Sequence, residues 1–235
     1  MNNLDKYWDK IHLKYTSTYD NWFDKYIHLL NKKDKIIELG CGRAYTSLYL
    51  LDNGFKDITA CDFSTEVISI LNAEHKELNT SIFDMSEKLP FNDNEINVII
   101  ADLSLHYFDS KTTKYIINER HRVLNNNGYL IGRVNSANDK YHIPVNAKVL
   151  EKNFYYDGEI YKKFFEEDNL KDIFKDFEIL FLEEKHMDRY EKPKTLWEFC
   201  IKKLDKWLSN FYFIPNVLNN KAPTINPIQI VIRTT

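Results

Sequence analysis

The chain begins with aromatic residues at helical spacing and then changes to short apolar runs that alternate with amphipathic segments. Over residues 3–30, aromatic and aliphatic positions recur at intervals of three and four, which predicts a helix rather than a strand. Thr18 or Asp20 could cap this helix. We interpret residues 1–32 as a helical lid whose aromatic side chains reach the substrate. The alternative is an amphipathic helix that only covers a sheet.

From residue 35 onward, the pattern predicts strands separated by helices. The expected strands cover residues 35–39, 57–61, 80–83, 96–100 and 129–134. Alternation at this spacing is typical of βαβ units with right-handed crossovers. The sequence therefore predicts a doubly wound, mostly parallel α/β sheet with helices on both faces. Ligands of such sheets bind at the carboxyl ends of the strands.

The second half of the chain departs from this alternation. Residues 136–165 are too aromatic for a disordered loop, and their length predicts a substrate cap. A helix at about 166–175 precedes two strand-like segments, 177–183 and 195–201. Their short connection predicts an antiparallel hairpin at one side of the sheet, which completes seven strands. Residues 203–235 contain several prolines and are interpreted as a C-terminal extension, either an extra edge strand or a tail.

Composition and charge exclude several classes of protein. The 32 Lys and Arg against 35 Asp and Glu give a net charge of -3, so we expect no nucleic-acid partner. No apolar run reaches the length of about 18 residues that a membrane span needs, and the start does not resemble a signal peptide, so we expect a cytoplasmic protein without a membrane partner. The 3 cysteines are far apart, which excludes a disulfide framework and a cysteine-rich zinc site; we expect no metal. The oligomeric state stays open.

A glycine turn follows the first expected strand, in the segment Glu38-Leu39-Gly40-Cys41-Gly42. Its two glycines let backbone amides approach a ligand closely. The next helix presents free N–H groups and its positive dipole end to that ligand. A dinucleotide fingerprint beginning at Gly40 needs a small residue at position 45, where the chain has Tyr45, and a phosphate loop of the P-loop type is absent. The turn is therefore a poor site for a pyrophosphate.

Acidic residues stand at the carboxyl ends of three successive expected strands. Glu38 would repel a phosphate but attract a cation, and Asp62 can accept hydrogen bonds from both hydroxyls of a ribose. Asp84 can accept one from the exocyclic amine of adenine. Each acid alone could be a helix-dipole partner, a loop cap or a turn residue. Together they favour a cofactor with a cation, a ribose and an adenine but no phosphate, namely S-adenosylmethionine.

This ordered set resembles the class I S-adenosylmethionine-dependent methyltransferases, with Ala44 where that family usually has a third glycine. We assign residues 33–202 to a cofactor-binding domain of this kind, with 136–165 as its aromatic cap. Residues 42–50 and 162–174 look somewhat like tellurite-resistance-type methyltransferases, although those carry an Arg in the place of Tyr45. The resemblance implies a set of cofactor-binding residues: Glu38, Gly40, Cys41, Gly42, Asp62, Phe63, Ser64, Asp84, Met85, Ala101 and Asp102.

Methyl transfer from a sulfonium is an in-line displacement that depends mainly on alignment, so few obligatory side chains are expected. His106, after the fourth strand, is the candidate catalytic base or acceptor-orienting group. The alternative is a structural histidine. Arg133, at the end of the fifth strand, either clamps an anionic acceptor or forms a salt bridge with a neighbouring acid. The candidate substrate residues are Tyr19, Tyr107, Asn135 and His142; for Tyr107, simple packing is the alternative.

The sequence therefore predicts an enzyme that methylates a small molecule. Aromatic segments at 7–26 and 141–165 favour a partly apolar acceptor enclosed away from water. Neither the acceptor nor its methylated atom can be read from the sequence. One alternative is a non-catalytic S-adenosylmethionine-binding module. Another is a nicotinamide-dependent oxidoreductase, against which Tyr45 argues.

Overall fold

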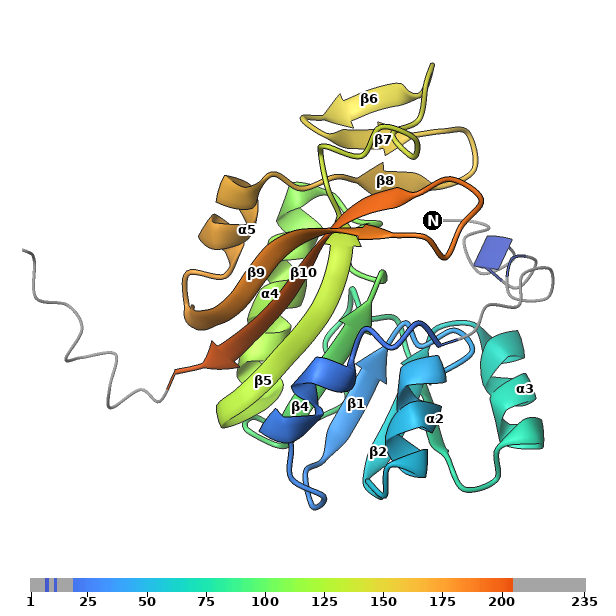
Figure 1. Ribbon diagram of the computed structural model, residues 1–235, viewed down its shortest axis with the longest axis vertical. Coiled ribbons are helices and arrows are strands. Elements are labelled where there is room, and N and C mark those ends of the chain that lie inside the picture. The colour runs from blue at the N-terminus through green and yellow to red at the C-terminus, as the bar shows by residue number, and fades with distance from the viewer. Residues whose placement is uncertain (1–6, 9–10, 12–18, 205–235) are drawn as a thin grey trace, which may run out of the picture. The chain divides into compact units, whose positions relative to one another are not determined.

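The computed structural model describes residues 7–8, 11 and 19–204, and its main feature is a seven-stranded sheet (Figure 1). The strand order is β3-β2-β1-β4-β5-β10-β9. In this order, the neighbouring strands β3, β2, β1, β4 and β5 pair in parallel, whereas β10 runs antiparallel to both β5 and β9. The bounds are β1 Ile36–Leu39, β2 Ile58–Asp62, β3 Asn79–Ile82, β4 Ile96–Asp102, β5 Leu124–Asn135, β9 Phe177–Met187 and β10 Lys194–Lys203. The expected doubly wound sheet with an antiparallel hairpin at one side is confirmed.

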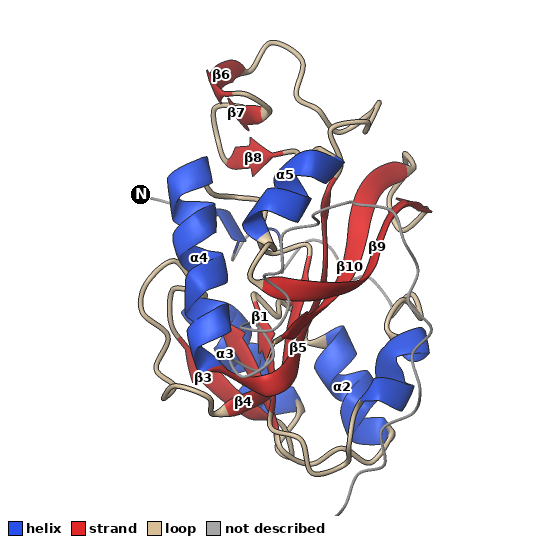
Figure 2. Cartoon of the chain, turned by 90° about the vertical axis from the view of Figure 1, so that its left-hand side faces the viewer, coloured by secondary structure: helices blue, strands red, loops and turns tan. Residues whose placement is uncertain are grey.

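Helices cover both faces of this sheet, and Figure 2 shows α2 and α4 on opposite sides of it. The helical elements are η1 Asp24–Leu29 (a 3-10 helix), α2 Tyr45–Asp52, α3 Thr65–Glu74, α4 Ser110–Val123 and α5 Glu167–Ile173. Side chains of η1, α2 and α3 share one hydrophobic core with Ile36 and Val98. Side chains of α4 and α5 share a second core with Ile37 and Ile99. The central strands are therefore apolar on both faces, as buried parallel strands require.

Polar caps fix where the crossover helices begin. Ser64 Oγ accepts a hydrogen bond of 3.1 Å from the Val67 backbone N–H and so caps α3. Asp109 caps α4 in the same way, with its Oδ1 2.7 Å from the Thr112 backbone nitrogen. Each helix begins directly after the loop that follows a parallel strand. The caps therefore define the edge of the sheet where the site lies.

The N-terminal segment is less helical than its aromatic spacing predicts. Within the described residues of this segment, 7–8 and 11 are helical and η1 is a short 3-10 helix whose N-cap, Phe23, provides no side-chain hydrogen bond. Thr18 lies outside the described residues. Asp20 is not a cap, because its carboxylate is held by Arg133 of β5 and by Arg189 of the loop between β9 and β10. The aromatic side chains of Trp22 and Tyr26 instead pack in the core.

Residues 136–165 contain a second sheet that the sequence pattern did not indicate. Its antiparallel strands are β6 Lys148–Glu151, β7 Phe154–Tyr156 and β8 Tyr161–Lys163. Figure 1 shows this sheet beyond the carboxyl end of β5. Strands of three or four residues are too short for a clear alternation of apolar and polar positions. In the described part of the chain, none of the helices is long and apolar enough to cross a membrane.

Candidate functional site

Glu38, at the end of β1, is buried beneath the first turn of α2. Its Oε2 accepts hydrogen bonds from the Ser47 backbone N–H at 3.0 Å and from the Ser47 hydroxyl at 2.6 Å. Burial raises the pKa of the Glu38 carboxyl to about 7, although the bonds from Ser47 lower it. The carboxyl is therefore close to half-ionised at neutral pH. A cation brought next to it would favour the charged form.

The glycine turn closes tightly against the loop after β4. Gly40 has a φ of +63°, and a Cβ at this position would lie 2.6 Å from Ser104 Cβ and 2.9 Å from Met85 Cε. Ser104 fixes the approach because its hydroxyl donates a 2.6 Å hydrogen bond to the Leu39 carbonyl. Only glycine fits both the backbone conformation and the space. The turn thus brings the ends of β1 and β4 and the residues after β3 together.

Asp62, at the end of β2, links the glycine turn to the start of α3. Its Oδ2 accepts from the Gly42 backbone N–H and its Oδ1 from the Ser64 backbone N–H, both at 3.0 Å. Each carboxylate oxygen has a second lone-pair position for another donor. The side chain is buried, and its orientation is fixed by two loops at once. A rigid acceptor pair of this kind suits the two hydroxyls of a ribose.

Asp84 and Met85 follow β3 at the same edge of the sheet. Asp84 Oδ1 accepts from the Ser86 backbone N–H at 2.8 Å and from its hydroxyl at 2.7 Å. The Met85 carbonyl accepts a 3.1 Å hydrogen bond from Arg120 of α4. Burial lowers the pKa of Arg120 to about 9. The structure therefore places Glu38, Asp62 and Asp84 at the carboxyl ends of three neighbouring strands, as the sequence predicts.

Arg133, at the end of β5, belongs to a network of two arginines and two aspartates. Its Nε lies 2.7 Å from Asp102 Oδ1, and its Nη1 lies 2.9 Å from Asp20 Oδ2. Arg189 Nη2 lies 2.9 Å from Asp20 Oδ1. The guanidinium of Arg133 also packs over the Trp22 ring, 4.6 Å from its centroid. Arg133 is therefore a salt-bridge residue rather than a free clamp for an acceptor.

The same network sets the charges of its members. Burial raises the pKa of the Asp102 carboxyl, but Arg133 and Arg189 outweigh it and hold that pKa below its usual value. Burial lowers the pKa of Arg133, but Asp102 and Asp20 outweigh it and raise that pKa. Asp102, Arg133 and Arg189 therefore stay charged at neutral pH. The side chain of Asp102, expected among the cofactor-binding residues, faces these arginines.

His106, Tyr107 and Asn135, which the sequence analysis proposes for the acceptor, lie together beyond the carboxyl end of β4 and at that of β5. The His106 carbonyl accepts a 2.8 Å hydrogen bond from the Lys163 backbone N–H, and the Lys163 carbonyl accepts one of 3.2 Å from Asn135 Nδ2. His106 Nδ1 and Asn135 Oδ1 are buried and have no hydrogen-bond partner among the described residues. Burial holds the pKa of His106 well below its usual value, so the imidazole is neutral at neutral pH. Tyr107 packs against His106 and Trp8.

Two expected substrate residues have structural partners instead. The Tyr19 hydroxyl donates a 2.8 Å hydrogen bond to Asp24, and its ring stacks on Tyr49. His142 Nδ1 lies 3.1 Å from both carboxylate oxygens of Asp139, which is itself buried. These contacts explain both side chains without an acceptor. The structure thus gives no support to Tyr19 or His142 as acceptor-binding residues.

The remaining expected residues fit the same edge of the sheet. Cys41 is buried with a free thiol, and its backbone N–H donates to the Cys61 carbonyl at 3.0 Å. Ala101 is fully buried within β4, and Phe63 is half-buried after β2. In the described part of the chain, His, Cys, Asp and Glu residues form no group of three or more that could hold a metal ion.

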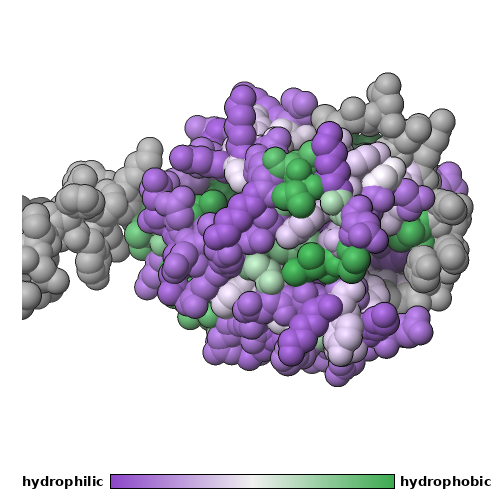
Figure 3. Space-filling model, turned by 90° about the horizontal axis from the view of Figure 1, so that it is seen from above, coloured by the Kyte–Doolittle hydropathy of each residue, from purple (hydrophilic) through white to green (hydrophobic). Residues whose placement is uncertain are grey.

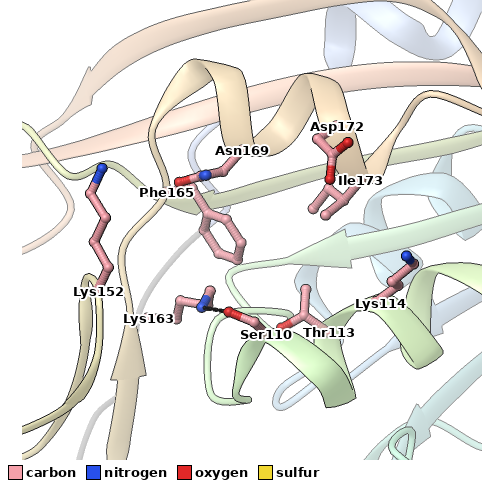
Figure 4. Close-up of a pocket in the computed structure, with 9 residues that line it drawn as sticks. All are labelled: Ser110, Thr113, Lys114, Lys152, Lys163, Phe165, Asn169, Asp172 and Ile173. Carbon is pink, nitrogen blue, oxygen red and sulfur yellow. Dashed lines mark hydrogen bonds between the residues drawn. The ribbon is translucent and has the colours of Figure 1, made fainter.

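Two hollows lie away from the glycine turn. The first, of about 280 Å³, opens between α4 and α5. There, Lys163 Nζ donates a 2.7 Å hydrogen bond to the Ser110 hydroxyl (Figure 4). The second, of about 710 Å³, is lined by Tyr141, His186 and neighbouring residues. Seen from the β6–β8 end, the surface is mostly hydrophilic with separate hydrophobic patches (Figure 3).

Sequence reasoning missed three charged residues: Arg189 and Lys194, near His106 and Arg133, and Arg120, next to Met85. Residues 190–194 have the composition of a turn, and such a segment gives no sign that a lysine in it is buried. Arg120 stands in a helix with two other basic residues in its last turn, where an exposed position is the ordinary expectation. Only the tertiary packing shows that both Arg120 and Lys194 are buried.

Comparison with known proteins identifies the central part of the chain. Residues 37–132 match the model of a family described as a methyltransferase domain. This segment runs from β1 into β5 and includes the glycine turn and all three strand-end acids. It stops before the hairpin β9–β10 and before the β6–β8 sheet.

Solved structures share the fold at low sequence identity. A methyltransferase from Methanosarcina mazei has 21% identity and a TM-score of 0.68, covering 80% of this chain and 99% of its own. TehB from Haemophilus influenzae has 18% identity and a TM-score of 0.62, covering 80% and 63%. A 1,6-didemethyltoxoflavin-N1-methyltransferase from Burkholderia thailandensis, solved with that compound and S-adenosylhomocysteine, has 16% identity and a TM-score of 0.58, covering 77% and 75%.

A curated human protein also matches part of the chain. The mitochondrial arginine-hydroxylase NDUFAF5 is 25% identical over 116 residues, which are 49% of this chain. The match spans 32% of the human protein's length. The likeness therefore concerns about a third of that protein.

Proposed function

We propose that this chain, a class I S-adenosylmethionine-dependent methyltransferase, transfers the methyl group of its cofactor to a small-molecule acceptor at the carboxyl ends of β4 and β5. One observation carries the proposal. The three acids Glu38, Asp62 and Asp84 end neighbouring strands around a glycine turn in which a Cβ at Gly40 would clash. Their acceptor oxygens fit a cofactor that offers a cation, a ribose and an adenine amine.

The cofactor half of the site works by binding and orientation. S-adenosylmethionine supplies a methyl group on a positively charged sulfur, which is already activated for displacement. Asp62 is proposed to accept from the ribose hydroxyls and Asp84 from the adenine amine. Glu38 is proposed to face the cationic end, where its pKa of about 7 would fall as the positive charge approaches. No phosphate-binding element is required.

The acceptor half offers buried polar atoms and aromatic walls. His106 is neutral at neutral pH, and its lowered pKa disfavours the imidazolium, so its unpartnered Nδ1 is proposed to orient the acceptor through a hydrogen bond rather than to act as a base. Asn135 Oδ1 would accept a hydrogen bond from the acceptor, and Tyr107 would pack on it. The Burkholderia methyltransferase, which was solved with bound 1,6-didemethyltoxoflavin, supports an acceptor of this size. We also propose a cytoplasmic enzyme without a nucleic-acid partner, which the net charge of -3 supports.

Replacing Asp62 with Ala is expected to weaken cofactor binding. The variant loses two charge-assisted hydrogen bonds to the ribose, so the dissociation constant of S-adenosylhomocysteine should rise about 10- to 150-fold, or about 1.5–3 kcal/mol. Isothermal titration calorimetry measures this constant. Asp52→Ala, at the exposed end of α2, is the control and should bind as the natural protein does. An unchanged affinity in Asp62→Ala would count against the ribose assignment.

Enzymatic turnover separates the proposal from its alternatives. Labelled S-adenosylmethionine is incubated with a panel of thiols, amines, carboxylates and chalcogen oxyanions, and transfer of the label is counted. A non-catalytic scaffold would bind S-adenosylhomocysteine without transferring label to any compound. A nicotinamide-dependent oxidoreductase would be stabilised against heat by NADH and not by S-adenosylhomocysteine.

A further inference from the structure

Lys194, the first residue of β10, is a buried cation without a hydrogen-bond or ion-pair partner among the described residues. Its exposed fraction is 8%. Among the described residues, its ammonium forms no hydrogen bond or ion pair, and its recorded contact is with the Tyr190 ring, 5.6 Å from the centroid. Burying an ammonium without acceptors for its three N–H groups is costly. An oxyanion bound there would supply these acceptors.

The lysine lies on the acceptor side of the site. In the antiparallel pairing, Leu196 of β10 stands opposite Asn135 of β5. Lys194 precedes Leu196 by two residues and so lies on the same face of the sheet. Its positive charge also lowers the pKa of His106, so the ammonium is close enough to act on the imidazole. Burial in turn lowers the pKa of Lys194 to about 8, which leaves the ammonium charged at neutral pH.

The charged groups that act on Lys194 already have partners of their own. Asp139 accepts hydrogen bonds from the backbone N–H groups of Tyr141, His142 and Thr195. Lys162 is paired with Asp157 at 2.8 Å. Asp102 is held by Arg133, as described above. The donors of the Lys194 ammonium therefore remain available to a ligand.

Two further buried atoms near this lysine lack partners. They are His106 Nδ1 and Asn135 Oδ1, on residues that are each 2% exposed. Buried polar groups in native proteins are nearly always hydrogen-bonded, so unpaired ones need an explanation. A single ligand that carries an oxyanion and a second polar group would satisfy Lys194, His106 and Asn135 together.

We propose that Lys194 binds a carboxylate of the methyl acceptor, while His106 and Asn135 contact its second polar group. A carboxylate offers two acceptor oxygens and one negative charge, which complement one ammonium. The arginines at this edge are not available for that task, because Asp20 and Asp102 already neutralise them. This assignment rests on the proposed function, and it narrows the acceptor to a carboxylic acid with an apolar body.

The test compares each carboxylate with its own neutral amide. The natural protein, saturated with S-adenosylhomocysteine at pH 7, is titrated with benzoate and benzamide, then with phenylacetate and phenylacetamide. At least one carboxylate is expected to bind about tenfold more tightly than its amide, as one charge-assisted hydrogen bond implies. Phenyl phosphate is the third arm, and it should bind no better than benzoate because its second charge has no partner.

Variants test whether Lys194 is the source of the preference for the carboxylate over its amide. Lys194→Met should abolish the preference for the carboxylate, and Lys194→Arg should keep most of it. Lys185→Met, on the neighbouring strand β9 and opposite Leu196, is the matched control and should keep it fully. Because the methionine removes an unpaired buried charge, Lys194→Met should melt at the same temperature as the natural protein or higher.

Each outcome decides the assignment. Equal affinity for acid and amide in every pair, no binding of any carboxylate, tighter binding of phenyl phosphate, or a preference that survives in Lys194→Met would each overturn it. Binding of S-adenosylhomocysteine to the natural protein is a separate control, because it tests the proposed function rather than the role of Lys194. If S-adenosylhomocysteine does not bind the natural protein, the proposed function fails; if it binds and the carboxylates show no preference, only the assignment of Lys194 fails.

Discussion

Replacing Arg133 with Met is expected to lower the free energy of unfolding by about 3–5 kcal/mol, because the substitution leaves a buried carboxylate without its main partner. Arg133 is 3% exposed and holds Asp102 through bonds of 2.7 and 2.9 Å. Methionine fills a similar volume, so the loss reports on charge more than on packing. Urea denaturation at pH 7 measures it.

A paired variant is the control for this prediction. In Arg133→Met with Asp102→Asn, both charges are removed, and Asp20 and Arg189 keep each other as partners. The double variant should therefore lose less stability than Arg133→Met alone. Lower pH should also reduce the loss in the single variant, since protonation would discharge Asp102. A loss below about 1 kcal/mol in the single variant, the scale of an exposed ion pair, would contradict the structural role of the network.

The second large effect concerns Glu38 and pH. Its pKa is about 7 in the folded protein and 4.5 as the ordinary value, so the folded state binds this proton more tightly than the unfolded state. The contribution of Glu38 to the free energy of unfolding should therefore fall as pH rises from about 4.5 to about 7 and stay low above that. The total change is about 3 kcal/mol, since one pKa unit corresponds to about 1.36 kcal/mol.

Glu38→Gln should remove this dependence. The difference in stability between the natural protein and the variant is measured by urea denaturation at pH 5 and at pH 8, and it should shift in favour of the variant at pH 8. Glu77→Gln, in an exposed turn, is the control and should run parallel to the natural protein. If Glu38→Gln and the natural protein also run parallel, the buried carboxyl is already ionised at pH 5.

Much of the cofactor half could be predicted from the sequence. Apolar runs such as Ile36–Leu39 and Ile96–Asp102 are short and followed by turn residues, which favours buried strands, and parallel strands bring their carboxyl ends to one edge. Acids at the ends of such runs therefore lie at one edge of the sheet, as Glu38 and Asp62 do. The cap of α3 follows from equally local chemistry, because Ser64 bonds to a residue three positions away.

The proposed acceptor half of the site could not be predicted in the same way, because its residues contact partners that are distant in the sequence. Arg133 is hydrogen-bonded to Asp20, which is 113 positions away in the sequence, and Arg189 is hydrogen-bonded to Asp102, which is 87 positions away. The choice between a clamp and a salt bridge for Arg133 could not be made until those acids were located. Lys194 looks like an exposed turn lysine, yet the packing buries it. The β6–β8 sheet could not be predicted, because its strands are too short to show an alternation of apolar and polar residues.

The backbone of Lys163 has a consequence for how such enzymes diversify. Through its N–H and carbonyl, this one residue of β8 holds the carbonyl of His106 and the side chain of Asn135. The β6–β8 sheet thus positions His106 and Asn135, while the hydrogen bonds of Asp62 are made within the loops that follow β1 and β2. If the proposed function holds, exchanging the β6–β8 sheet should change which acceptor is methylated and leave the methyl donor unchanged.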